Sequence, residues 1–196
     1  TDLGLTARNL AAYTAAIEQA GGLVLCVGPE ASGRTTTLHA ALAHLNTPAR
    51  KILTAERSVT ITQRGVRQIQ VRRTGEPSAL SGLRAIAQAD ADVLMVDDLD
   101  DSLSARLVVD LAASGMLVLA ATTGSSAWGA VSRLMSMGID GDSLADALRG
   151  VLVQRLVRRL CSHCMRSSPA DSGQLEWLQR AWRADSHVPG SPEPAP

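Results

Sequence analysis

Short apolar runs alternate along this chain with longer segments in which apolar positions recur at helical spacing. The runs are rich in Val, Leu and Ile, which predicts buried strands at 23–27, 51–55, 92–96 and 116–121. The longer segments predict amphipathic helices at 6–20, 36–45, 80–89 and 103–114. Strands separated by helical crossovers predict an α/β fold with a doubly wound, mostly parallel sheet.

The remaining segments are less regular. Residues 59–62 and 68–71 alternate polar and apolar positions, which predicts two strands with one face in water. Helices are predicted to fill most of 127–160. Residues 167–173 are typical of a linker, 174–184 of one short helix, and the Pro-rich end of a disordered tail.

Composition narrows the class of protein. The chain has 196 residues, which suits one domain with a small appendage. Hydrophobic residues make up 45% but aromatic residues only 2%, so the core must be built from Leu, Val, Ile and Ala. Lys plus Arg (19) equals Asp plus Glu (19), and this balance predicts no nucleic-acid partner and no attraction to a membrane surface.

The cysteines and the apolar runs indicate a compartment. Cys26, Cys161 and Cys164 give no disulfide framework, which suits a reducing environment. No secretory signal opens the sequence, and no apolar run reaches the roughly 18 residues needed to cross a bilayer. We therefore expect a cytoplasmic protein.

A glycine-rich loop follows the first predicted strand. Residues 28–35 fit the phosphate-loop pattern G-x-x-x-x-G-K-[ST] except that Arg34 stands at the lysine position. A strand, loop and helix in this order aim backbone N–H groups at one point, which suits a polyphosphate. The alternative is an ordinary Gly-rich turn. The predicted nucleotide-binding residues are Gly28, Pro29, Glu30, Ala31, Ser32, Gly33, Arg34, Thr35 and Thr36.

Polar residues follow the other predicted core strands. Glu56, the pair Asp97 and Asp98, and the pair Thr122 and Thr123 each come directly after a strand. Ligands of open parallel sheets lie outside the carboxyl ends of the strands. We therefore expect these side chains and the loop to converge on one edge of the sheet.

Five blocks of sequence carry a family resemblance. Residues 28–37 resemble G-P-T-G-S-G-K-S-T-T, 52–57 resemble I-L-T-V-E-D, and 90–98 resemble D-P-D-V-I-M-V-G-E. Residues 117–123 stand where L-V-L-S-T-L-H is expected, and 151–164 nearly reproduce V-L-A-Q-R-L-V-R-R-L-C-P-H-C. On these motifs the chain resembles the C-terminal motor domain of the type II secretion and type IV pilus assembly ATPases.

The resemblance implies an architecture and a function. It implies a RecA-like P-loop NTPase domain over 1–166, with a helical C-terminal portion at about 127–166, followed by a linker, short helix and tail at 167–196. Family members are hexameric ATP-driven motors that act with inner-membrane platform proteins of a secretion or pilus machine. They are cytoplasmic and lie peripherally at the inner membrane through these partners.

The departures from the family patterns fall at catalytic positions. Arg34, Asp98 and Thr123 replace the expected Lys, Glu and His, so that it is uncertain whether the chain is an enzyme. Arg57 replaces an acidic residue and inverts its charge. Ala31 replaces a loop glycine, which costs on the order of 1 kcal/mol if the position needs a positive φ.

The same motifs give the candidate catalytic and metal-binding residues. Glu56, Asp97 and Asp98 are the candidate catalytic residues. Asp97 replaces a glycine of the family pattern, but it stands where many other P-loop proteins have an Asp that supports Mg²⁺. Thr35 and Asp97 are therefore the candidate Mg²⁺ ligands for bound ATP. A plainer alternative is that Asp97 and Asp98 are two solvated acids at a strand end. Two functions remain open: an ATP-binding motor-type domain with weak or lost hydrolysis, and a non-catalytic pseudo-ATPase that regulates or completes the machine. An unrelated P-loop enzyme such as a small kinase conflicts with the block 151–164.

The remaining Cys, His and Arg residues allow plain interpretations. Cys161 and Cys164 form half of the zinc site that the resemblance implies, but a structural zinc needs four ligands, so two reduced thiols are favoured and zinc is not expected. Cys26 is expected in the core, and His39 and His44 on the surface. A basic cluster is either a solvated edge or a contact to a neighbouring subunit or its nucleotide; it comprises Arg64, Arg67, Arg72 and Arg73.

Overall fold

The chain forms two units. The computed structural model describes the backbone of residues 3–72 and 78–185, and side chains as far as residue 181. The first compact unit is Thr1–Leu156 and the second is Val157–Pro196. The division falls earlier than the boundary at 166 that the family resemblance implied.

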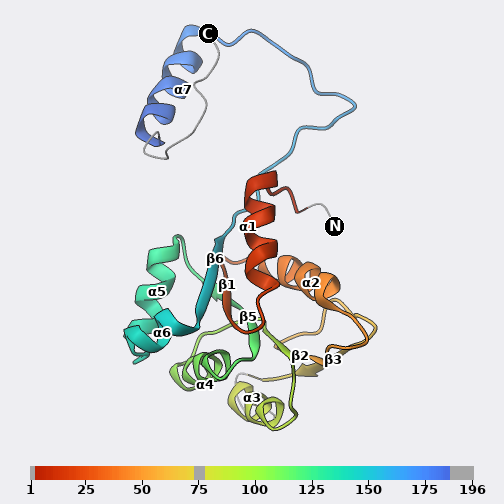
Figure 1. Ribbon diagram of the computed structural model, residues 1–196. Helices are drawn as coiled ribbons and strands as arrows, with labels where there is room; N and C mark the ends of the chain where they lie inside the picture. Colours follow the sequence, from red (N-terminus) through yellow and green to blue (C-terminus); the bar gives the residue numbers. More distant parts are fainter. Residues whose placement is uncertain (1–2, 73–77, 186–196) are drawn as a thin grey trace. The chain divides into compact units, whose positions relative to one another are not determined.

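A six-stranded sheet forms the centre of the first unit (Figure 1). Its spatial order is β3-β2-β4-β5-β1-β6, and every neighbouring pair is parallel. The strands are β1 (Gly22–Gly28), β2 (Ile52–Glu56), β3 (Val66–Gln70), β4 (Val93–Val96), β5 (Leu117–Thr123) and β6 (Leu148–Val153). The prediction of a doubly wound parallel α/β sheet is confirmed.

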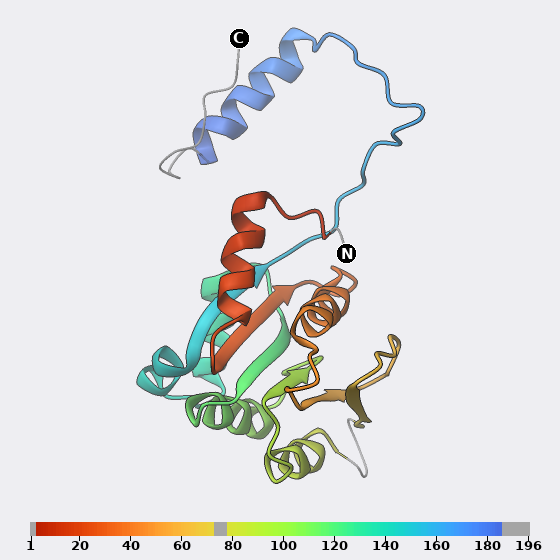
Figure 2. The same ribbon diagram turned by 45° about the vertical axis from the view of Figure 1, so that its right-hand side comes forward.

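Helices cover both faces of the sheet (Figures 1 and 2). On one face lie α1 (Ala7–Ile17) and α2 (Arg34–Leu45), and on the other lie α3 (Ala79–Ala87), α4 (Ser102–Ala113), α5 (Ala127–Ser136) and α6 (Gly141–Ala147). Most of these helices begin at a side-chain cap, which satisfies an otherwise unpaired N–H group. The capping residues are Thr6, Ser78, Asp101, Ser126 and Asp140.

Alternation along the strands builds two hydrophobic cores. In β1, Leu23, Leu25 and Val27 pack with α3 to α6, whereas Val24 and Cys26 pack with α1 and α2. All seven residues of β1 are buried, as expected for a central strand of a parallel sheet. The prediction that Cys26 belongs to the core is confirmed.

Two sequence predictions of secondary structure are wrong. Residues 148–153, expected to be helical, form β6 and pair with β1, because a short apolar run with two valines suits a strand as well as a helix. The helical portion therefore does not extend through 127–166. Residues 59–62 form no strand; the carbonyl of Ile61 instead accepts a hydrogen bond from the Gln68 side chain, at 2.8 Å.

The second unit contains one helix. A turn spans 162–164, and α7 (Ser172–Asp185) matches the short helix predicted at 174–184. The side chains of residues 157–181 are exposed. Residues 186–196, where a disordered tail was predicted, lie outside the described residues. Within the part of the chain that is described, no helix combines the length and apolar content that a membrane crossing requires.

Candidate functional site

The glycine-rich loop connects β1 to α2 at the carboxyl edge of the sheet. Gly28 is the last residue of β1, and Gly33 caps α2 with a left-handed φ of 84°. A side chain at position 28 would collide with the Ser32 hydroxyl, because an added Cβ would lie 2.3 Å from it. Both glycines are therefore required by the path of the loop.

Ala31 adopts a conformation that favours glycine. Its φ is 58°, which lies in the left-handed region. A residue with a Cβ costs roughly 1–2 kcal/mol there. The expectation that this substitution strains the loop is confirmed, and the loop keeps its shape in spite of that cost.

Ser32 supplies an unsatisfied polar group inside the loop. Its side chain is 3% exposed, and its hydroxyl has no hydrogen-bond partner among the described residues. Buried hydroxyl groups are usually paired, so this one is available to a ligand or to an ordered water. It lies beside the N-terminus of α2, where backbone N–H groups and the helix dipole favour an anion.

Gln154, the residue after β6, binds the loop through its side chain. The sequence analysis did not single it out. Its Nε2 donates to the carbonyl of Ser32 at 2.7 Å, and its Oε1 accepts from the Cys26 thiol at 3.2 Å. Its backbone N–H donates to the carbonyl of Val27 at 2.8 Å. The only signal in the sequence was its place in the block 151–164.

Arg34 turns toward the end of β5. Its Nη1 donates to the Thr123 hydroxyl at 3.2 Å. Thr123 stands opposite Gly28 in the β1–β5 register, so the two are neighbours at the sheet edge. Two of the positions that depart from the family pattern therefore contact each other.

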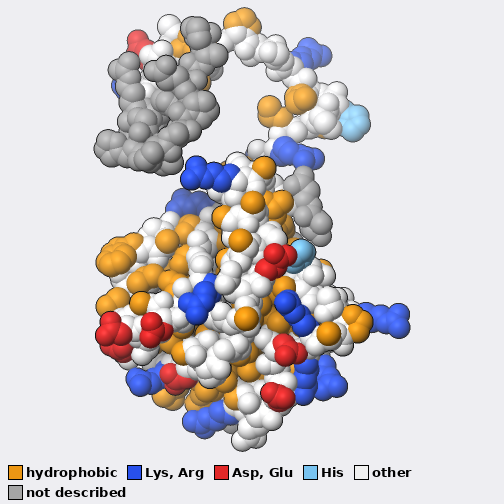
Figure 3. Space-filling model, in the orientation of Figure 1, with side chains coloured by type: hydrophobic (Ala, Val, Ile, Leu, Met, Phe, Trp, Pro, Cys, Tyr) orange, Lys and Arg blue, Asp and Glu red, His pale blue; other side chains and the backbone are white. Residues whose placement is uncertain are grey.

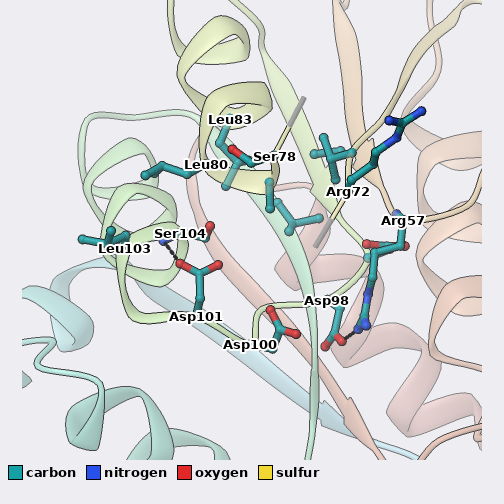
Figure 4. Close-up of a pocket in the computed structure, with 15 residues that line it drawn as sticks. Arg57, Arg72, Ser78, Leu80, Leu83, Asp98, Asp100, Asp101, Leu103 and Ser104 are labelled. Carbon is teal, nitrogen blue, oxygen red and sulfur yellow. Dashed lines mark hydrogen bonds and ion pairs between the residues drawn. The ribbon is translucent and has the colours of Figure 1, made fainter. Parts of the chain in front are cut away.

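Arg57 interacts with both acids that follow β4 (Figure 4). Its backbone N–H donates to Oδ2 of Asp97 at 2.7 Å, and its guanidinium forms an ion pair with Asp98. The Asp98 side chain is only 12% exposed. Burial raises the pKa of Asp97, although the N–H group and the charge of Arg57 oppose this shift. The alternative of two solvated acids does not describe this pair.

These acids do not fit a Mg²⁺ ion as they stand. Mg²⁺ requires charged oxygen ligands in near-ideal octahedral geometry. Asp98 is already neutralised by Arg57, and Asp97 is desolvated and accepts the Arg57 N–H group. Thr35, the other predicted Mg²⁺ ligand, lies in the first turn of α2.

Glu56 lies in a buried polar network. Its side chain is fully buried, and Oε1 accepts from the Thr54 hydroxyl at 2.6 Å and from Gln68 Nε2 at 2.9 Å. Oε2 lies 3.1 Å from Nε2 of His39. His39 is 2% exposed, so its predicted surface position is wrong, whereas His44 is half exposed as predicted. A catalytic role for Glu56 stays a prediction; the carboxylate here ties α2 to β2 and β3.

A cavity of ≈ 350 Å³ opens beside the acids (Figure 4). It lies between the carboxyl ends of β2 and β4 and the helices α3 and α4. Its polar lining includes Arg57, Arg72, Asp97, Asp98 and Asp100. None of the residues 28–36 lines it, so the cavity adjoins the acidic half of the site and not the loop.

Cys161 and Cys164 are exposed and bracket the turn in the second unit. The pKa of the Cys161 thiol is lowered by hydrogen bonds. The largest effect comes from the backbone N–H of His163, followed by the side chain and the backbone N–H of Cys164. Among the described residues, no group of three or more His, Cys, Asp or Glu side chains could hold a metal ion.

The predicted basic cluster is divided between two places. Arg72 lines the cavity beside the acids, and Arg67 lines a second cavity at the opposite edge of the sheet. Arg64 lies in the loop before β3, and its carbonyl accepts from the Asn46 side chain. Arg73 lies outside the described residues.

The structure is thus an α/β fold with a six-stranded parallel sheet and a glycine-rich loop that leads from β1 to the N-terminus of α2. A family model described as "Type II/IV secretion system protein" matches residues 1–188, and the chain belongs to this family. It is 41% identical over 178 residues to a putative type II secretion system protein E of Escherichia coli K12, covering 91% of this chain and 36% of that protein. It is 43% identical over 162 residues to type II secretion system protein HxcR of Pseudomonas aeruginosa, covering 83% of this chain and 34% of that protein.

The chain thus spans about a third of the length of these relatives. Solved structures share the fold. The pilus retraction motor PilT with bound ADP aligns with a TM-score of 0.69 at 21% identity, covering 94% of this chain and 58% of that one. The ATPase DotB of Yersinia pseudotuberculosis aligns with a TM-score of 0.68 at 20% identity, covering 80% of this chain and 44% of that one.

The Glu56 network predicts a large stability effect at one position. Glu56→Ala would leave His39, Gln68 and Thr54 without their buried acceptor, and we expect a loss of roughly 2–5 kcal/mol in the free energy of unfolding. Glu18→Ala is the matched control, because Glu18, at the end of α1, pairs at an exposed position with His44, which lies on α2 as His39 does. It should cost at most about 1 kcal/mol. Urea denaturation of both variants checks this, and equal losses would contradict it.

The raised pKa of Asp97 predicts a dependence of stability on pH. As pH rises above about 3.9, the usual Asp value, the unfolded chain releases this proton before the folded chain does, so Asp97 becomes progressively destabilising. Asn does not titrate and can still accept the Arg57 N–H group. Asp97→Asn should therefore be more stable relative to the wild type at pH 7 than at pH 3.5, as measured by urea denaturation. If the stability of Asp97→Asn relative to the wild type is constant or decreases from pH 3.5 to pH 7, the pKa of Asp97 is not raised in the folded chain.

Proposed function

We propose that this chain is the nucleotide-binding, motor-type domain of a type II secretion or type IV pilus assembly system, with weak or lost ATP hydrolysis. The observation that carries the proposal is the geometry of β1, the loop and α2. Two left-handed residues, Ala31 and Gly33, shape a loop that ends at a helix N-terminus. The unpaired Ser32 hydroxyl supports a polar ligand at this point.

The residues of the loop bind and orient the phosphates in this proposal. Backbone N–H groups at the start of α2 hold the phosphate oxygens, and the hydroxyls of Thr35 and Thr36 lie on the same turn. Gln154 fixes the position of the Ser32 carbonyl and hence of the loop. Arg34 supplies a positive charge, but it must leave Thr123 before it can reach a phosphate.

Two contacts and the burial of one carboxylate support weak or absent hydrolysis. Arg34 is engaged with Thr123, Asp98 is paired with Arg57, and Glu56 is buried away from solvent. A residue that orients an attacking water must reach it at hydrogen-bond distance. A carboxylate held in an ion pair is poorly placed for this, and a displacement of about 1 Å can lower a rate about a hundredfold.

The family suggests the partners. Relatives named type II secretion system protein E and the pilus retraction motor PilT support a place in a secretion or pilus machine. The oligomeric, hexamer-type assembly is what the family resemblance implies. We further propose that this domain acts at the cytoplasmic side of the inner membrane, peripherally, through platform proteins of the machine.

A non-catalytic pseudo-ATPase is the second candidate. It is favoured by the fact that the positions that depart from the family pattern contact other residues of this chain: Arg34 contacts Thr123, and Arg57 contacts Asp98. Such a protein would keep the fold and regulate or complete the machine through protein contacts. ATP turnover separates a domain with weak hydrolysis from a non-catalytic one. If phosphate release by the wild type equals that of an Arg34→Ala/Asp98→Ala double variant, the domain is non-catalytic.

Titration with a fluorescent ATP analogue tests the proposed binding. We expect saturable binding by the wild type and at least tenfold weaker binding by Gly33→Ala, because position 33 shapes the loop. Gly138→Ala is the matched control: Gly138 has a φ of 86°, close to the 84° of Gly33, but lies outside the loop. It should bind as the wild type does. No saturation at millimolar nucleotide, or equal binding by Gly33→Ala, would overturn the proposal.

A further inference from the structure

A second cavity lies at the edge of the sheet opposite the loop. It measures ≈ 280 Å³ and opens at the amino ends of β2 and β3. Three basic side chains line it from two segments: Arg50 and Lys51 from the residues just before β2, and Arg67 from β3. In Figure 3, Lys and Arg side chains, with Asp or Glu side chains among them, lie over the part of the molecule where Figure 1 places β2 and β3.

The charges around this cavity are not balanced. Asp92 is the single acidic residue in its lining, and its Oδ2 accepts the backbone N–H of Lys51 at 2.6 Å. The Lys51 ammonium, from the only lysine of the chain, donates to the carbonyl of Ala89. Arg50 and Arg67 form no ion pair within the described ranges 3–72 and 78–181. Like charges gathered around a concave surface attract anions.

The walls of the cavity are fixed by local hydrogen bonds. The N–H of Arg50 donates to the carbonyl of Thr47 at 3.1 Å, which closes the turn that carries Arg50. Across the cavity, Asn46 Nδ2 donates to the carbonyl of Arg64 at 2.7 Å and ties the turn before β3 to the end of α2. Gly65 in that turn has a φ of 88° and would place a Cβ only 2.9 Å from Asn46. The arrangement is therefore largely preformed, which lowers the entropic cost of binding.

We propose that this cavity binds a small anion that carries phosphate groups, independently of the nucleotide loop. Two guanidinium groups present planar forks that match phosphate oxygens, and the lysine adds a point charge. The volume is near the lower end of the range for small-molecule sites. This assignment also gives Arg67 a role that the sequence analysis left open between a solvated edge and a subunit contact.

Titration of the isotope-labelled chain with pyrophosphate, followed by NMR, tests the site. Pyrophosphate is expected to bind the loop as well, but the two sites report through different amides. We expect saturable shifts at Lys51, Gly65, Arg67 and Asp92, and a Kd for these shifts at least tenfold higher in Arg50→Ala/Arg67→Ala. Arg64→Ala is the matched control, because Arg64 is a nearby exposed arginine that does not line the cavity. Its Kd should equal that of the wild type.

Three results would overturn this proposal. They are shifts confined to residues 28–36, the absence of saturation at the opposite edge, and a Kd there that the double variant leaves unchanged. If pyrophosphate shifts the amides at the opposite edge but not those of residues 28–36, only the proposed nucleotide function is contradicted. The double variant changes two side chains that are not buried. A cooperative thermal unfolding transition is the control that it is folded.

Discussion

The parallel pairing of β1 with β5 on one side and β6 on the other is the constraint on which the site depends. The register places Gly28 opposite Thr123 and Val27 opposite Val153. The loop that leaves β1 is thereby held between the ends of two neighbouring strands. Arg34 reaches Thr123 on one side, and Gln154 reaches Ser32 on the other. The shape of the loop is therefore set by the sheet as much as by its glycines.

The charges at this edge neutralise one another within the chain. Arg57 satisfies both acids after β4, one through its backbone and one through its guanidinium, and Glu56 is enclosed by donors from α2, β2 and β3. A site that binds and activates a charged substrate usually keeps such groups available to the ligand. Here the phosphate loop is retained while the surrounding acids are paired internally, which supports binding with little or no hydrolysis.

Sequence patterns predicted the sheet, the loop and the edge where the polar residues meet, because periodicity and strand ends determine these features directly. They did not predict β6, since the apolar run at 148–153 suits either a helix or a strand until its pairing with β1 is known. The burial of His39 and the Arg57–Asp98 pair were also missed. Both depend on contacts between residues distant in sequence, so neither has a local signature. Gln154 was overlooked for the same reason.

The most direct test of the central claim is the affinity of ATP measured by calorimetry with and without Mg²⁺, for the wild type and for Arg57→Gln. If Arg57 neutralises Asp98 and thereby makes the acids unsuitable for Mg²⁺, the wild type should bind ATP with a Kd that Mg²⁺ hardly changes. Arg57→Gln, which releases Asp98, should bind more tightly when Mg²⁺ is present. A wild-type Kd that falls tenfold or more on addition of Mg²⁺ would contradict the account.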